Sequence, residues 1–149
     1  MRLRGVSNVS LDAKGRFALP KAVRDQLEAE CDGQVVVTAD PEDPCLLIYP
    51  LPEYEQKEEA VHRLPNQRSD KARKIQRLFI GYAQEMRLDG NGRLLLNARQ
   101  RQYAGLERRL VLIGQGNKLE LWSEGAWDAW LGKEGDAGAD EAALAELSL

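Results

Sequence analysis

The sequence of 149 residues predicts an α+β fold made of two similar halves. Three observations support this prediction. The segment 10–27, SLDAKGRFALPKAVRDQL, is echoed by the segment 87–104, RLDGNGRLLLNARQRQYA. Short runs of β-branched and apolar residues alternate with turn signals, which is typical of strands. Between these runs, apolar residues recur with the spacing of a helix. Strands and helices mixed within each half make the predicted class α+β.

The internal repeat is the strongest organising signal in the chain. The motif Asp-x-x-Gly-Arg at 12–16 recurs at 89–93, 77 positions later. Further along, the apolar runs of the two copies match with a spacing of 73 positions. The first copy therefore has a connection four residues longer, ADPEDP against GQGN.

Each copy is expected to form strand, turn, strand, helix, strand, turn, strand and helix. The turns DAKG at 12–15 and DGNG at 89–92 have Asp first and Gly fourth, which suits a type I turn with a left-handed glycine. Pro20 is predicted in the first turn of a helix, because its missing N–H would be unpaired there anyway. Strands are expected at 5–11, 16–19, 34–39, 45–49, 109–114 and 118–122.

The segment between the copies predicts two helices rather than a flexible linker. Tyr54, Val61 and Leu64 keep helical spacing until Pro65 interrupts the run. Ser69 can cap a second helix, in which apolar residues follow at i, i+3 and i+7. We expect this helix to turn its apolar residues toward the core.

The sequence thus divides into a first motif at 1–54, a helical connector at 55–80, a second motif at 81–131 and an acidic tail at 132–149. The tail is rich in Gly and Ala and is predicted to be mostly disordered, with a short helix at 142–147. A copy this short buries too little surface to be stable alone. The two copies are therefore expected to pair around one core, related by a pseudo-twofold axis, with both turn tips in related positions.

Charge is distributed unevenly, although the net charge is only −3. Residues 1–24 carry six lysines and arginines against Asp12 alone, and residues 63–77 carry six against Asp70 alone. The tail is acidic. Because binding responds to the local field, an acidic protein of this kind can still bind a polyanion.

Several classes of function find no support in the sequence. Cys31 and Cys45 are the only cysteines and are expected to be reduced, structural thiols, so neither a disulfide framework nor a metal site is predicted. His62 is the only histidine, and we expect it to lie partly exposed on a helix. No cofactor or catalytic constellation is visible, so an enzyme is not predicted. The sequence shows no signal peptide or membrane-spanning run, which points to the cytosol.

Five segments together resemble the MraZ family of bacterial transcriptional regulators. They are LDAKGRFALPKAVRDQL, DPEDPCLLIYPLPEYE, RLFIGYAQEMRLDGNGRLLL, YAGL and VLIGQGNKLELW, and the resemblance covers roughly residues 1–131. It implies two tandem SpoVT-AbrB motifs, each a swapped hairpin, paired in a β-barrel-like core with flanking helices.

The same resemblance implies a function. It is that of a sequence-specific DNA-binding regulator, chiefly a repressor, of the division and cell-wall gene cluster and of its own promoter. Double-stranded DNA with short direct repeats would be one partner and the protein itself, as a ring-shaped homo-oligomer, the other. A cytoplasmic, nucleoid-associated protein with no membrane or small-molecule partner is expected.

The first turn tip is the predicted reading head. Arg16 is expected to read bases or a key phosphate, since the arginine fork can donate two hydrogen bonds to guanine. Asp12 either holds the Arg16 guanidinium or closes the turn through its own oxygen, and Gly15 shapes the loop. Phosphate contacts supply affinity and register. We assign them to Arg2, Arg4, Lys14, Lys21 and Arg24.

The second copy departs from the first. Arg93, with Asp89 and Gly92, repeats the tip, and it serves either DNA binding or folding and subunit contacts. Asn97 stands where the first copy has Pro20, and Gln100 stands where it has an apolar valine. The second helix is therefore expected to start or pack differently.

Other readings remain open. An ordinary solvated hairpin would also account for a single DAKGR. The basic stretch 68–77 is read as a solvated helix face, with subunit contact as the alternative. Trp122, Trp127 and Trp130 are expected to be core and interface anchors rather than stacking platforms for bases. An antitoxin-like or scaffold protein, with the acidic tail wrapping a partner, is the competing function.

Overall fold

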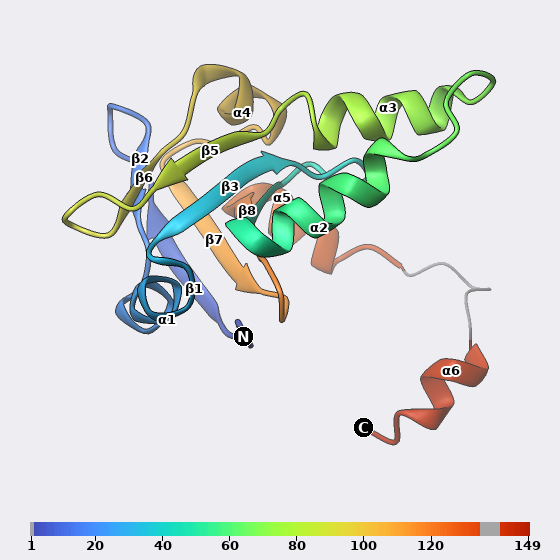
Figure 1. Ribbon diagram of the computed structural model, residues 1–149. Helices are drawn as coiled ribbons and strands as arrows, with labels where there is room; N and C mark the ends of the chain where they lie inside the picture. Colours follow the sequence, from blue (N-terminus) through green and yellow to red (C-terminus); the bar gives the residue numbers. More distant parts are fainter. Residues whose placement is uncertain (1, 135–140) are drawn as a thin grey trace.

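The computed structural model describes residues 2–134 and 141–149 and has the predicted α+β class (Figure 1). The first copy contains β1 (Val6–Ser10), β2 (Arg16–Ala18), α1 (Lys21–Cys31), β3 (Gln34–Ala39) and β4 (Leu46–Pro50). Two helices follow, α2 (Leu51–His62) and α3 (Asp70–Phe79). The second copy contains β5 (Gln84–Arg87), β6 (Arg93–Leu95), α4 (Ala98–Tyr103), β7 (Arg109–Gly114), β8 (Leu119–Ser123) and α5 (Glu124–Leu131). The last helix is α6 (Glu141–Glu146).

The two copies exchange strands reciprocally. The main sheet has the order β1-β7-β8-β4-β3-β5, and its neighbours are antiparallel. The first strand of each copy therefore pairs with the third strand of the other copy, β1 with β7 and β5 with β3. A separate two-stranded sheet joins β2 to β6. Neither copy completes its own sheet, which agrees with the expectation that they share one core.

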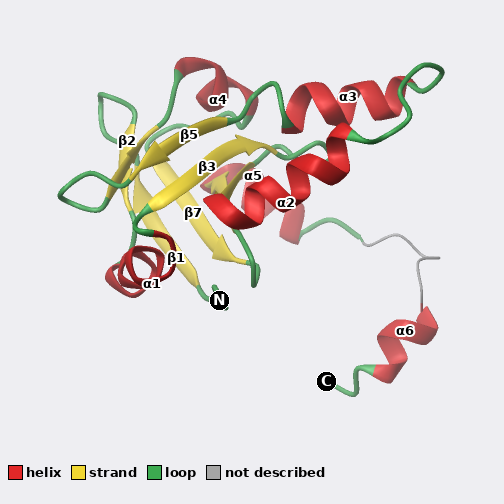
Figure 2. Cartoon of the chain, in the orientation of Figure 1, coloured by secondary structure: helices red, strands yellow, loops and turns green. Residues whose placement is uncertain are grey.

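The core lies on both faces of the main sheet. Along β4 and most of β3 every residue is buried, so these central strands read as continuous apolar runs rather than as alternating ones. One face packs against the β2–β6 pair and against Leu27 of α1. The other face packs against Tyr54 of α2, Phe79 of α3 and the helix α5. Helices α2 and α3 lie at the end of the molecule remote from the two hairpin turns (Figure 2).

The connector forms the two predicted helices. Ser69 caps α3 as expected, since its hydroxyl oxygen accepts a hydrogen bond from the N–H of Ala72 at 3.1 Å. Phe79 is buried, so the basic helix turns an apolar side to the core. The predicted boundary between 54 and 55 falls inside α2, which begins at Leu51 directly after β4.

The helices that follow the turns differ between the copies. Pro20 is the residue before α1 rather than part of its first turn, because α1 begins at Lys21. In the second copy the side chain of Asn97 caps α4 by accepting from the Gln100 N–H, and Oε1 of Gln100 accepts from the Asn97 N–H. Gln100 is fully buried and donates to the carbonyl oxygens of Val37 and Tyr82. The predicted difference at these positions is therefore confirmed.

The three tryptophans form one cluster. Trp122 lies in the core, but Trp130 is 44% exposed and lies outside it. Trp130 stacks on the half-buried Trp127 with ring centroids 5.4 Å apart, so the cluster extends from the core to the surface. Trp130 lies in the last turn of α5, and its role as an interface anchor stays a prediction.

Three further predictions concern the tail, the cysteines and the membrane. The described part of the tail contains α6, which overlaps the predicted helix at 142–147, whereas the disorder predicted for 135–140 lies outside the described residues. Cys31 and Cys45 are both free thiols. Within residues 2–134 and 141–149, none of the helices combines the length and the apolar character needed to cross a bilayer.

Candidate nucleic-acid interface

The first hairpin turn, residues 12–15, is closed by the carboxylate of Asp12. Its Oδ1 accepts hydrogen bonds from the backbone N–H groups of Lys14 and Arg16, each at 2.9 Å. Its Oδ2 accepts from Nε of Arg16 at 3.0 Å. The N–H of Gly15 donates to the Asp12 carbonyl at 3.0 Å, and Gly15 has φ +87°, as the predicted turn requires. Asp12 therefore performs both of the roles considered for it.

The second turn, residues 89–92, repeats this geometry. Oδ1 of Asp89 accepts from the N–H groups of Asn91 and Arg93 at 2.9 Å, and Oδ2 accepts from Nε of Arg93 at 2.9 Å. Gly92 has φ +70° and donates to the Asp89 carbonyl at 2.9 Å. Two segments with different middle residues thus build the same device, an aspartate that fixes an arginine four positions later.

The aspartates are held in the charged form. The backbone N–H of Arg16 is the main cause that lowers the pKa of Asp12 below its usual value, and its guanidinium adds to the effect. In the second turn, the backbone N–H of Arg93 likewise lowers the pKa of Asp89. In each turn the carboxylate binds Nε of the arginine. The two terminal nitrogens of the guanidinium are separate donors that this bond does not use. These nitrogens are the donors that a phosphate or a guanine edge requires.

Pairing of β2 with β6 places the two arginines in one short two-stranded sheet. Arg16 is the register partner of Leu95, and Arg93 is the register partner of Ala18, so the arginines lie at opposite ends of a short antiparallel pair. Their side chains are 28% and 30% exposed, respectively. Both turns project from the same end of the molecule (Figure 1). A single ligand surface can therefore meet both tips.

After its short strand, each copy contacts the turn of the other copy. The N–H of Leu19 donates to the carbonyl of Gly92 at 3.0 Å, and the N–H of Leu96 donates to the carbonyl of Gly15 at 2.9 Å. Helices α1 and α4 follow directly, so each begins beside the turn of the other copy. In this position Arg24 of α1 donates from a terminal nitrogen to the carbonyl of Asn91 at 3.2 Å.

The other predicted cations fall in two groups. Lys14 is exposed at the first tip, and Lys21 lies beside the second, where it forms an exposed ion pair with Asp25 at 2.7 Å. Arg2 and Arg4 are exposed at the far end of β1, because Leu3 between them bridges to Gly116 in the β7–β8 turn. The structure thus brings Lys14, Lys21 and Arg24 to the tips, and it does not bring Arg2 and Arg4 there.

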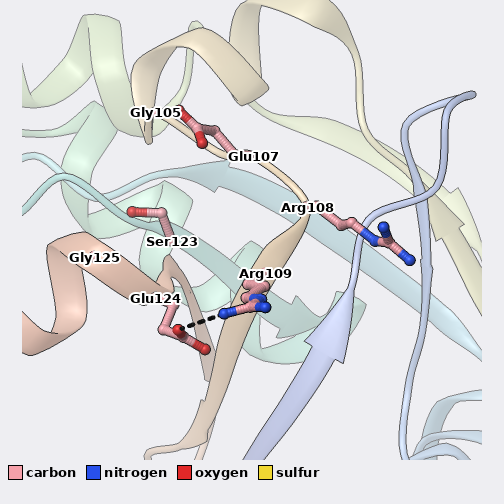
Figure 3. A pocket seen from close by; sticks show the side chains of 7 residues that line it. All are labelled: Gly105, Glu107, Arg108, Arg109, Ser123, Glu124 and Gly125. Atoms are coloured by element: carbon pink, nitrogen blue, oxygen red, sulfur yellow. Dashed lines mark ion pairs between the residues drawn. The ribbon is translucent and has the colours of Figure 1, made fainter.

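Sequence reasoning missed Arg108, which lies beside the first turn. The N–H of Leu11 donates to the Arg108 carbonyl at 2.8 Å, so β1 leads past this residue into the turn. In Figure 3 the side chain of Arg108 extends toward the first hairpin, whereas Arg109 points to Glu124, 3.9 Å away. The doubled arginine before strand 109–114 was the available signal. Arg108 lies beside the first turn only because β1 of the first copy pairs with β7 of the second.

One acidic cluster lies away from the tips. Asp40, Cys45 and Glu120 have ligand atoms close enough to share a metal ion. Burial raises the pKa of the Cys45 thiol, and the thiol donates to Asp40 at 3.5 Å. The Cys45 thiol thus keeps its proton in a hydrogen bond to Asp40, whereas a metal would require the thiolate.

The fold and the tips define a class of protein with two intertwined copies of a hairpin motif and a fixed arginine on each projecting turn. Such an end is suited to hydrogen bonding with an anionic, polar surface. The comparisons with known proteins identify the family. A family model described as "MraZ protein, putative antitoxin-like" matches twice, over residues 3–78 and 79–146. The chain belongs to the MraZ family.

Curated relatives cover almost the whole chain. Proteins named "Transcriptional regulator MraZ" match from Thioalkalivibrio sulfidiphilus at 48% identity (98% of this chain and 99% of the relative) and from Halorhodospira halophila at 50% (92% of each). The protein of that name from Pseudomonas aeruginosa is 52% identical over 85% of this chain and 83% of its own length.

Proposed function

We propose that the protein is a transcriptional regulator that binds specific DNA sequences through its two turn tips. The observation that carries the proposal is the repeated Asp–Arg device, because each guanidinium is fixed at one nitrogen and keeps its outer donors for a ligand. Arg16 is the principal reader of base edges or of a key phosphate, and Arg93 supports it from the second tip. Lys14, Lys21, Arg24 and Arg108 supply phosphate contacts.

The proposal extends to the assembly and the targets, on the basis of the family. Each copy contributes a SpoVT-AbrB motif, at 1–54 and 81–131, of the swapped-hairpin type with a barrel-like core. The reciprocal strand exchange supports this description. The protein acts in the cytoplasm, on the nucleoid. It represses its own promoter and the division and cell-wall gene cluster.

A ring-shaped homo-oligomer explains how a few cations can give tight binding. One protomer offers only a small basic surface, so its affinity for one site is modest. When several protomers are joined, every contact after the first is intramolecular and occurs at a high effective concentration. Short direct repeats with the spacing of the subunits are the matching DNA. Arg2 and Arg4, remote from the tips, would reach DNA only from such an assembly.

A fluorescence-anisotropy titration tests the proposal. The duplexes are the region upstream of the encoding gene and a scrambled sequence of equal length, each at two salt concentrations. We expect a clear preference for the upstream duplex. We also expect a steep loss of affinity with salt, with a logarithmic slope of about −0.9 per phosphate neutralised. Equal binding to both duplexes, or a complex insensitive to salt, would contradict the proposal.

A second candidate function is that of an antitoxin-like or scaffold protein. It is supported by the family description, which includes the word "antitoxin-like". In that case the acidic tail 132–149, which includes α6, would engage a protein partner. Deletion of 132–149 separates the two functions. The regulator keeps its DNA binding without the tail, whereas an interaction protein loses its partner.

A further inference from the structure

We infer that Arg101 is a positioning residue for the first turn tip, acting from the second copy on Arg16 of the first. The inference rests on the proposed function, because it deepens the account of how that tip binds DNA. Arg101 lies in α4, 85 positions away from Arg16 in the chain. The exchange of chain segments between the copies brings it beneath the turn.

The contact is made at Gly15. A Cβ atom on this glycine would lie 3.2 Å from Nε and 3.3 Å from Cζ of Arg101. The guanidinium therefore lies directly against the glycine. Gly15 is buried, although Ala13 and Lys14 in the same turn are exposed. The residue that follows it is Arg16, so Arg101 supports the peptide from which the reading arginine emerges.

The second tip has the reciprocal contact. A Cβ on Gly92 would lie 2.1 Å from Cδ of Arg24, which is the residue of the first copy that corresponds to Arg101. Arg24 also donates to the carbonyl of Asn91 at 3.2 Å. Each tip is therefore supported by an arginine from the other copy, and the same arrangement arises twice from different local sequences. This recurrence is hard to attribute to incidental packing.

Arg101 is half-buried, and the enclosure of its Nε does not stabilise the fold. Its Nε is enclosed, and no hydrogen-bond partner for it exists in the described part of the chain. A buried donor without a partner costs stability. An enclosed Nε is also unable to donate to a DNA phosphate unless the side chain moves. The aliphatic stem and the flat guanidinium of Arg101 fill the space next to Gly15 and so support the turn by packing.

Two substitutions of Arg101 separate the volume of its side chain from its charge. Arg101→Ala removes the support, whereas Arg101→Met keeps a long unbranched side chain under Gly15 and removes both the charge and the unpaired donor. The control is Arg99→Ala, which removes one exposed arginine from the same helix. All variants are titrated with the upstream and scrambled duplexes at two salt concentrations, with thermal melting alongside.

We expect Arg101→Ala to lose about tenfold in affinity for the upstream duplex, equivalent to about 1.4 kcal/mol, with the salt slope on scrambled DNA unchanged. Arg101→Met recovers most of this loss, and Arg99→Ala shows neither effect. In free protein, amide hydrogen exchange at 15 and 16 becomes faster in Arg101→Ala, whereas exchange at 92 and 93 does not change. This readout needs no DNA, so it tests the positioning role separately.

Three results would overturn the inference. The first is an unchanged preference for the upstream duplex and unchanged exchange in Arg101→Ala. The second is a fall of about 0.9 in the salt slope for both substitutions, which would make Arg101 a direct phosphate contact. The third is unfolding of both variants, which would make it a structural residue alone. If wild-type protein itself shows no preference for the upstream duplex, the proposed function fails, and hydrogen exchange still decides the role of Arg101.

Discussion

The carboxylate of Asp12 lies 3.0 Å from Nε of Arg16 through one oxygen, while its other oxygen accepts the backbone N–H of the same arginine at 2.9 Å. A single aspartate thus fixes both the backbone and the guanidinium of the proposed reading residue. Asp89 does the same for Arg93. Fixing the arginine in advance reduces the ordering cost at binding.

The two roles of Asp12 are separable by substitution. Asp12→Asn keeps one carbonyl oxygen for the backbone N–H groups of the turn, but its amide nitrogen cannot accept from Nε of Arg16. We expect Asp12→Asn to melt near the wild-type temperature and to bind the upstream duplex several-fold more weakly. Asp12→Ala should lower both the melting temperature and the affinity. Wild-type affinity in Asp12→Asn would show that the hydrogen bond between Asp12 and the Arg16 guanidinium does not contribute to DNA binding.

Acid should loosen both turns. The pKa values of Asp12 and Asp89 are lowered from 3.8 in the folded protein, mainly by the backbone N–H groups of the arginines. A lowered folded pKa gives stability that is present above the ordinary value and is lost as pH falls through the folded pKa. Chemical denaturation at a series of pH values should therefore show less acid destabilisation in Asp12→Asn/Asp89→Asn than in wild type. Equal acid sensitivity would contradict this reading of the two carboxylates.

Two glycines in the second turn should respond differently to a methyl group. Gly92 has φ +70°, and a Cβ there would lie 2.1 Å from Cδ of Arg24. Gly90 has open space around it. We expect Gly92→Ala to destabilise the protein by about 1–3 kcal/mol and Gly90→Ala to stay within about 0.5 kcal/mol. Denaturant unfolding measures both. Similar free energies of unfolding for the two variants would count against the strain expected from the positive φ together with the close approach of Arg24.

The second tip should contribute to DNA binding. We expect Arg93→Ala to weaken binding to the upstream duplex and to reduce the salt dependence, because a guanidinium near phosphate releases counterions. Titration at several salt concentrations, with melting curves, is the measurement. If Arg93→Ala lowers the melting temperature but leaves the affinity and salt slope unchanged, the second tip serves folding or subunit contacts instead.

Much of the fold could be predicted from local sequence. The strands at 34–39 and 109–114 coincide with β3 and β7, because β-branched and apolar runs between turn signals leave few alternatives. The cap at Ser69 was equally local. The contact between Asp12 and Arg16 could also be predicted from five residues, because a tight turn brings its first residue and the residue after it together.

Long-range features could not be predicted in this way. Gln100 is buried because its amide meets the carbonyl oxygens of Val37 and Tyr82, which are distant in the chain. The contacts of Arg24 and Arg101 with the opposite turns depend on the exchange of segments between the copies. Trp130 has an apolar side chain like its buried neighbour Trp122, but the end of α5 leaves it exposed. For Gln100, Arg24 and Arg101 the decisive neighbour comes from another part of the sequence.

The central claim, that the first tip reads DNA, is tested most directly with Arg16→Ala. Its control is Arg63→Ala. Arg63 lies on the surface directly after α2 and forms an ion pair with Glu59 of that helix. Both are titrated with the upstream duplex by fluorescence anisotropy, with melting curves measured on the same samples. The account predicts that Arg16→Ala loses the preference for the upstream duplex while melting normally, and that Arg63→Ala binds like wild type. If Arg16→Ala keeps that preference, or if it loses binding only because it unfolds, the first tip is a structural element rather than the reading head.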